Sequence, residues 1–178
     1  MVTILVISLI VLVLIMVLFG YFKTHVNKVK KINIKILEAE SQIKQLLNKK
    51  DELLISAKDH LGNDCKALDG IDDVCDISNN DFEYYDFLGK YYKRFDNFIS
   101  DDDFDASKLE DDSIEKISVL LKEEEEALSG CIRYYNDTAG EYNDLISNFP
   151  IKLISFICGY KHLSLFSIDN KSGFNTIK

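Results

Sequence analysis

The 178-residue chain is sharply divided by charge. Residues 1–22 contain no charged side chain, so residues 23–178 carry all 21 basic and 30 acidic side chains, with a net charge of −9. An apolar stretch of this length does not stay in water, which excludes a simple soluble enzyme. The acidic balance argues against nucleic acid as a partner, because phosphates require a basic surface. A single proline and eight glycines argue against a turn-rich β architecture.

Residues 1–22 are predicted to form a transmembrane anchor. As a helix they span roughly 33 Å at ~1.5 Å per residue, enough for a hydrocarbon core of about 30 Å. The alternative is a cleaved signal peptide. No Lys or Arg precedes the apolar run, the run is long for a signal, and no small-x-small cleavage pattern follows it, so a retained anchor is favoured.

Residues 23–35 form a basic neck directly after the anchor. Its five lysines, which precede the first acidic residue, are Lys23, Lys28, Lys30, Lys31 and Lys35. Subtracting these charges from −9 leaves −14 for the rest of the chain. The positive-inside rule then predicts an outside N-terminus and a cytoplasmic domain. The lysines are expected to lie against anionic headgroups, which makes membrane lipid one expected partner.

The four cysteines have no recognisable spacing, which is typical of a reducing compartment. They are Cys65, Cys75, Cys131 and Cys158. Cys65 and Cys75 could close a small disulfide loop if the domain lay outside the cell.

Helical periodicity dominates the domain expected over residues 36–163. An apolar seam interrupted only by Lys50 predicts a first helix that continues from the anchor to Leu61. A second helix is expected from Asp81 and a third from Ser113, with Pro150 stopping the third. No alternating strand pattern recurs. The predicted fold is all-α: one transmembrane helix continuing into an antiparallel helical bundle, followed by a flexible tail over residues 164–178.

The apolar segment 151–160 is too short to cross a membrane. Packing under the bundle is the favoured interpretation. The alternative places this segment along the membrane interface beside the lysines of the neck.

No catalytic, cofactor or metal site is expected. Asp101, Asp103, Asp105 and Asp112 fit positions of a calcium loop, but Ala106 replaces its glycine and Asp112 its glutamate, which favours a solvated acidic connection. The histidines, His25, His60 and His162, are scattered. The run 123–126 of four glutamates is interpreted as a solvated helix face.

A Tyr-Asn pair repeats after seven residues, as Tyr135-Asn136 and Tyr142-Asn143. Both tyrosines therefore return to one helix face and both asparagines to a neighbouring face. The favoured interpretation has the tyrosines in the core and the asparagines hydrogen-bonded across the bundle, fixing its register. The alternative is a polar recognition stripe.

At these residues the chain resembles the LemA family of bacterial membrane proteins. The residues that carry the resemblance are Ser41, Gln42, Ile43, Tyr135, Asn136, Tyr142, Asn143, Phe149, Pro150 and Gly159. The sequence departs from the family pattern at Glu40, where the family has an aromatic residue, and at 55–57, which lack Pro-Asn. Residues 62–112 match poorly, which makes this a divergent member.

The resemblance implies a membrane-anchored antiparallel helical domain without established enzymatic activity, in the bacterial inner membrane. The expected function is a scaffold or interaction protein with a protein partner, and self-association is permitted by the heptad seam. The alternative function is membrane shaping or anionic-lipid binding by the lysines of the neck and the 151–160 segment.

Overall fold

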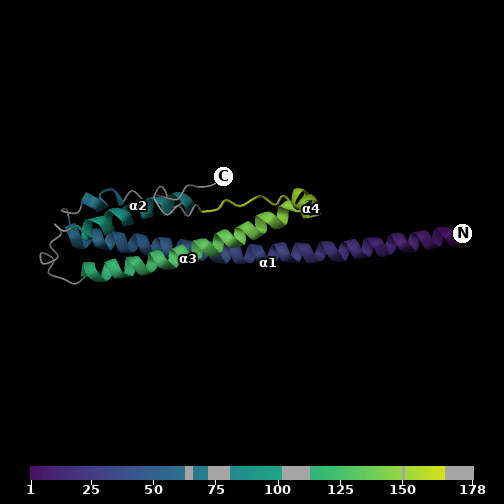
Figure 1. Cartoon of the computed structure of the whole chain (residues 1–178), viewed down its shortest axis with the longest axis horizontal. Helices are drawn as coiled ribbons and strands as arrows, with labels where there is room; N and C mark the ends of the chain where they lie inside the picture. The colour runs from purple at the N-terminus through teal and green to yellow at the C-terminus, as the bar shows by residue number, and fades with distance from the viewer. Residues whose placement is uncertain (63–65, 72–80, 102–112, 150, 167–178) are drawn as a thin grey trace. The chain divides into compact units, whose positions relative to one another are not determined.

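The computed structural model describes residues 1–62, 66–71, 81–101, 113–149 and 151–166. Within these ranges every regular element is a helix, which confirms the all-α prediction. The elements are α1 (Val2–Leu61), the short 3₁₀ helix η2 (Lys66–Leu68), α2 (Asp81–Ile99), α3 (Ser113–Ser147) and α4 (Ile151–Cys158) (Figure 1).

Helix α1 contains 60 residues and includes the whole apolar N-terminal stretch. Its most apolar 18-residue window has a mean hydropathy of 3.4, and none of that window is buried. By length and composition this segment can cross a membrane. The predicted continuation into the rest of the chain is confirmed, because no break occurs before Leu61. The helix ends where Gly62 adopts a positive φ of 63°, a conformation that glycine tolerates.

Helices α2 and α3 begin at the predicted residues, Asp81 and Ser113. Both carry acidic side chains in the first turn, which interact favourably with the positive end of the helix dipole. Helix α3 ends at Ser147, before Pro150, which lies outside the described residues.

The chain divides into two compact units. Unit 1 consists of Met1–Leu37 and Asp137–Leu163, and unit 2 of Glu38–Asn136 and Ser164–Lys178. The buried apolar side chains of unit 1 are Val29, Ile32, Ile36, Ala139, Tyr142, Ile146, Ile151 and Ile154. Those of unit 2 include Ile43, Leu47, Leu54, Leu88, Phe95, Leu121, Leu128, Ile132, Tyr135 and Phe166.

In unit 2 the chain directions of α1 and α3 are opposite. Cys131 Sγ lies 3.8 Å from Gln42 Oε1, and Lys49 pairs with Glu124. Moving forward along α1 from Gln42 to Lys49 therefore means moving backward along α3. The apolar face predicted for α1 is the face that it buries here, through Ala39, Ile43 and Leu47 among others.

Residues 164–166 are held in unit 2, although the sequence placed them in the tail. Phe166 is only 5% exposed, and its ring centroid lies 4.2 Å from that of Phe82 and 5.3 Å from that of Tyr135. The rest of the predicted tail, residues 167–178, lies outside the described residues.

Candidate functional site: the lysines of the neck and helix α4

All five lysines of the neck are exposed on α1. The same stretch of α1 buries Val29, Ile32 and Ile36 in unit 1. Lys28 Nζ lies 3.4 Å from Glu141 Oε1, with 55% and 52% of the two side chains exposed. An exposed pair of this kind contributes at most about 1 kcal/mol. The structure therefore leaves a basic, solvent-facing side on α1 directly after its apolar stretch.

Helix α4 has one buried and one exposed face. Ile151, Ile154 and Ser155 are buried in unit 1, which agrees with the favoured packing interpretation for this face. Leu153 and Phe156 are 59% and 89% exposed. Both faces are thus largely apolar, and among the described residues only the first is buried.

The end of α4 explains one residue of the family resemblance. Gly159 adopts a φ of +70°, and the Tyr160 N–H donates to the Ser155 carbonyl at 3.0 Å. This bond closes a Schellman C-cap, whose left-handed position strongly favours glycine. The chain then reverses away from the helix and continues as an extended segment.

The Tyr-Asn pair in unit 2 holds this extended segment. Tyr135 Oη donates to the Ser164 carbonyl at 3.0 Å. Asn136 Nδ2 donates to the Phe166 carbonyl at 2.7 Å, and Asn136 Oδ1 accepts from the Phe166 N–H at 2.8 Å. Burial raises the pKa of Tyr135 to about 12, with the carboxylates of Glu40 and Asp81 adding to the effect.

The pair in unit 1 makes the same type of contact. Asn143 Nδ2 donates to the Leu163 carbonyl at 2.9 Å, and its Oδ1 accepts from the Leu163 N–H at 2.8 Å. Tyr142 is buried, as predicted. The expectation that the asparagines hydrogen-bond across the helical bundle was wrong: Asn136 and Asn143 bind backbone groups of Phe166 and Leu163, which follow α4. An amide matches the donor and acceptor of an extended backbone, which explains the choice of asparagine.

A charged cluster in unit 2 was not anticipated. Lys50 is fully buried, and its Nζ donates to Glu125 Oε2 at 2.5 Å. The prediction that residues 123–126 form a solvated face is wrong for Glu124, which is buried and pairs with Lys49, whereas Glu125 is partly exposed. Burial lowers the pKa of Lys50, and the Glu125 carboxylate opposes this shift.

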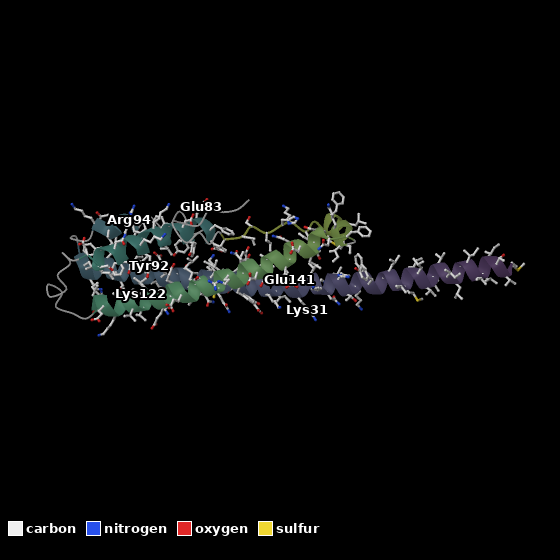
Figure 2. All side chains as sticks on the ribbon, viewed as in Figure 1. Lys31, Glu83, Tyr92, Arg94, Lys122 and Glu141 are labelled. Carbon is white, nitrogen blue, oxygen red and sulfur yellow. The ribbon has the colours of Figure 1, made fainter. Side chains whose placement is uncertain are left out.

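Three other residues that carry the family resemblance lie in or next to the packed helices of unit 2. Ile43 is buried in unit 2, Gln42 contacts Cys131, and Ser41 is exposed. Phe149, which lies between α3 and α4, is 82% exposed. Figure 2 shows the described side chains on the ribbon, with Lys31 of the neck and Glu141 of α3 among those labelled.

The described residues contain no group of three or more His, Cys, Asp or Glu side chains that could hold a metal ion. Of the candidate calcium ligands only Asp101 is described, while Asp103, Asp105 and Asp112 lie outside the described residues. Cys65 and Cys75 also lie outside them. Cys131 and Cys158 are free thiols.

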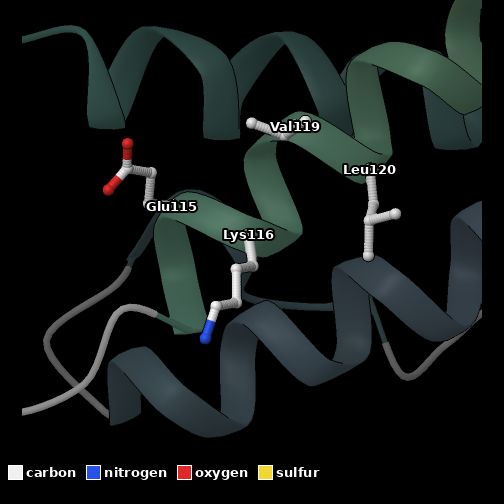
Figure 3. Close-up of a pocket in the computed structure, with 4 residues that line it drawn as sticks. All are labelled: Glu115, Lys116, Val119 and Leu120. Atoms are coloured by element: carbon white, nitrogen blue, oxygen red, sulfur yellow. The ribbon is translucent and has the colours of Figure 1, made fainter.

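A pocket of about 500 Å³ lies on α3 in unit 2 (Figure 3). Its lining consists of Glu115, Lys116, Val119 and Leu120. Val119 and Leu120 are exposed apolar side chains, and the lining has one charge of each sign.

Comparisons with protein-family models, with curated proteins and with solved structures find no match to this chain.

Proposed function

We propose that this chain is a divergent LemA-like membrane protein that acts as a helical scaffold for protein partners. Residues 1–22 anchor it in the bacterial inner membrane, and an antiparallel helical bundle lies on the cytoplasmic side. The observation that carries the proposal is the continuity of α1, which joins a fully exposed apolar segment to a helix that is buried on one face. The proposal includes no enzymatic activity.

The charge of the domain defines the partner that it would bind. Outside the lysines of the neck the net charge is −14, so a basic protein surface is complementary to it. Glu115, Glu123 and Glu126 are exposed on α3 and supply part of this charge. A second copy of the chain is the other partner that the heptad-like seam of α1 permits.

Crosslinking in native membranes tests the scaffold function. The full chain and the variant E115Q/E123Q/E126Q are crosslinked, purified and compared by mass spectrometry. The proposal expects a basic partner, or a second copy, that the wild type captures and the variant captures less. The control E52Q/D59N removes exposed charges from α1 instead and should retain the partner. Recovery of the same abundant proteins by all variants and by an unrelated membrane protein contradicts the proposal.

Anionic-lipid binding is the second candidate function. The exposure of all five lysines of the neck beside the apolar stretch favours it, and each contributes about 1 kcal/mol near an anionic surface. The full chain is reconstituted in vesicles containing a fluorescent phosphatidylglycerol, whose energy transfer from the protein reports lipid enrichment. The variant K23Q/K30Q/K31Q/K35Q should lose enrichment, and Lys28 is kept because of its contact with Glu141. The control K90Q/K93Q/K116Q/K122Q should retain it; equal loss in both contradicts this function.

A further inference from the structure

The exposed face of α4 is an apolar surface without a protein partner among the described residues. Phe149, Leu153 and Phe156 are 82%, 59% and 89% exposed. The helix itself is held in place, because Ile151 and Ile154 on its other face are buried in unit 1. Large aromatic side chains exposed on and next to a helix that is packed on its other face indicate an interaction site rather than chance exposure.

The position of α4 within unit 1 suggests what covers this face. Lys28 contacts Glu141, and α3 continues from Glu141 to Ser147 toward the apolar part of α1. Helix α4 and residues 1–37 of α1, which include the apolar stretch and the lysines, belong to the same unit, and in Figure 1 the N-terminal end of α1 extends beyond α4. Tyr21 and Phe22, at the end of the apolar stretch, are 47% and 43% exposed.

The charge around α4 is also complementary to an anionic membrane surface. Residues 145–163 contain no acidic side chain, in a chain whose net charge is −9. Lys152 and Lys161 are exposed there, and the lysines of the neck belong to the same unit. Basic side chains beside exposed aromatic side chains are typical of helices that lie in the headgroup region of anionic bilayers.

We propose that α4 is a second membrane contact, in which Leu153 and Phe156 of α4, together with Phe149 shortly before it, insert into the headgroup–acyl boundary of the bilayer that α1 crosses. This inference rests on the proposed membrane span of α1. The contact holds unit 1 against the membrane surface, because a helix anchored at one point only is free to tilt and rotate. Helices of this kind bury their apolar face about 5–10 Å deep.

The chain contains no tryptophan, so a single introduced tryptophan reports its own surroundings. The full chain is reconstituted in phosphatidylcholine–phosphatidylglycerol vesicles with lipids brominated on the acyl chains, which quench tryptophan on contact. F156W places the probe on α4, and F149W places it shortly before α4. V11W places it in the apolar stretch, and V119W places it on an exposed apolar position of unit 2.

The proposal expects F156W and F149W to emit at shorter wavelength than V119W and to lose most of their emission to brominated lipid. V119W should keep its emission, and V11W should be quenched. Quenching of V11W without quenching of either α4 probe overturns the α4 contact and leaves the membrane span intact. A blue-shifted but unquenched α4 probe means that protein covers the face, which also overturns it. An unquenched V11W overturns the span and the α4 contact together.

Discussion

The Lys50 side chain in α1 is 1% exposed, and its ammonium group binds Glu125 in α3, whose side chain is 33% exposed. Lys50 Nζ also lies 4.8 Å from the centroid of the Tyr92 ring. Removing an ammonium group from water is unfavourable, and the carboxylate and the ring face offset that cost. The two helices therefore share one buried positive charge that depends on a partner 75 positions away.

Replacing Glu125 by glutamine should destabilise the protein. The E125Q variant leaves Lys50 buried without its counter-charge, at a cost of about 3 kcal/mol, the low end for buried pairs because Glu125 is partly exposed. Thermal unfolding of the full chain in detergent, followed by circular dichroism, measures the loss. The double variant K50M/E125Q should regain most of it, since methionine fills the site without a charge. E126Q is the exposed control, and an equal loss there would contradict the explanation.

The stability of the E125Q variant should depend on pH in a defined direction. Burial already lowers the pKa of Lys50, and removal of Glu125 takes away the main cause that opposes this shift. Between the lowered folded-state pKa and about 10.5, the unfolded chain binds a proton that the folded chain does not, so stability rises with pH. The deficit of E125Q relative to wild type should therefore be smaller at about pH 9.5 than at about pH 7. A deficit that is constant with pH would show that Lys50 does not titrate in this range.

Local patterns in the sequence were sufficient to predict where α2 and α3 begin and where α1 ends. The starts at Asp81 and Ser113 follow from capping residues ahead of apolar periodicity, and the end of α1 follows from Gly62. The apolar face of α1 was also predicted, because burial repeats with the helical period.

Contacts between distant residues could not be predicted in the same way. Glu125 resembles a solvated charge when considered with its sequence neighbours alone. Lys50 is the one charge on the predicted apolar seam of α1, but only the packing of α3 against α1 supplies its partner. The partners of Asn136 were missed for a similar reason. No local pattern marks Phe166 as a core residue, since it follows a segment without helical periodicity.

Tyr135 should contribute to stability at neutral pH and lose that contribution in strong alkali. Y135F removes the hydrogen bond to the Ser164 carbonyl, at a cost of about 1 kcal/mol. An unfolded tyrosine ionises near pH 10, whereas burial raises the pKa of Tyr135 to about 12. Between these values the folded chain holds a proton that the unfolded chain has lost, so the wild type loses stability as pH rises. The difference between wild type and Y135F in chemical denaturation should shrink across this window; a constant difference contradicts the assignment.

Replacing Asn136 by aspartate should destabilise the protein. N136D replaces the amide that donates to the Phe166 carbonyl by a group that repels it, and leaves that carbonyl without its partner. A loss of about 1–3 kcal/mol is expected, with faster hydrogen exchange at the Phe166 amide. N97D, at an exposed position of α2, is the matched control and should change neither quantity. Unchanged exchange at Phe166 in N136D would mean that the amide does not hold this segment.

Two glycine-to-alanine substitutions in unit 1 should have opposite effects. At both Gly159 and Gly140 a Cβ would meet no atom within 4 Å, so packing does not distinguish the two positions. Gly159 has a φ of +70°, and alanine in this left-handed conformation costs about 1–2 kcal/mol. Gly140 lies inside α3, where alanine has the higher helix propensity by up to about 1 kcal/mol. Thermal unfolding of the full chain should therefore show G159A destabilised and G140A stabilised. A neutral G159A would exclude the Schellman cap as the reason for glycine after α4.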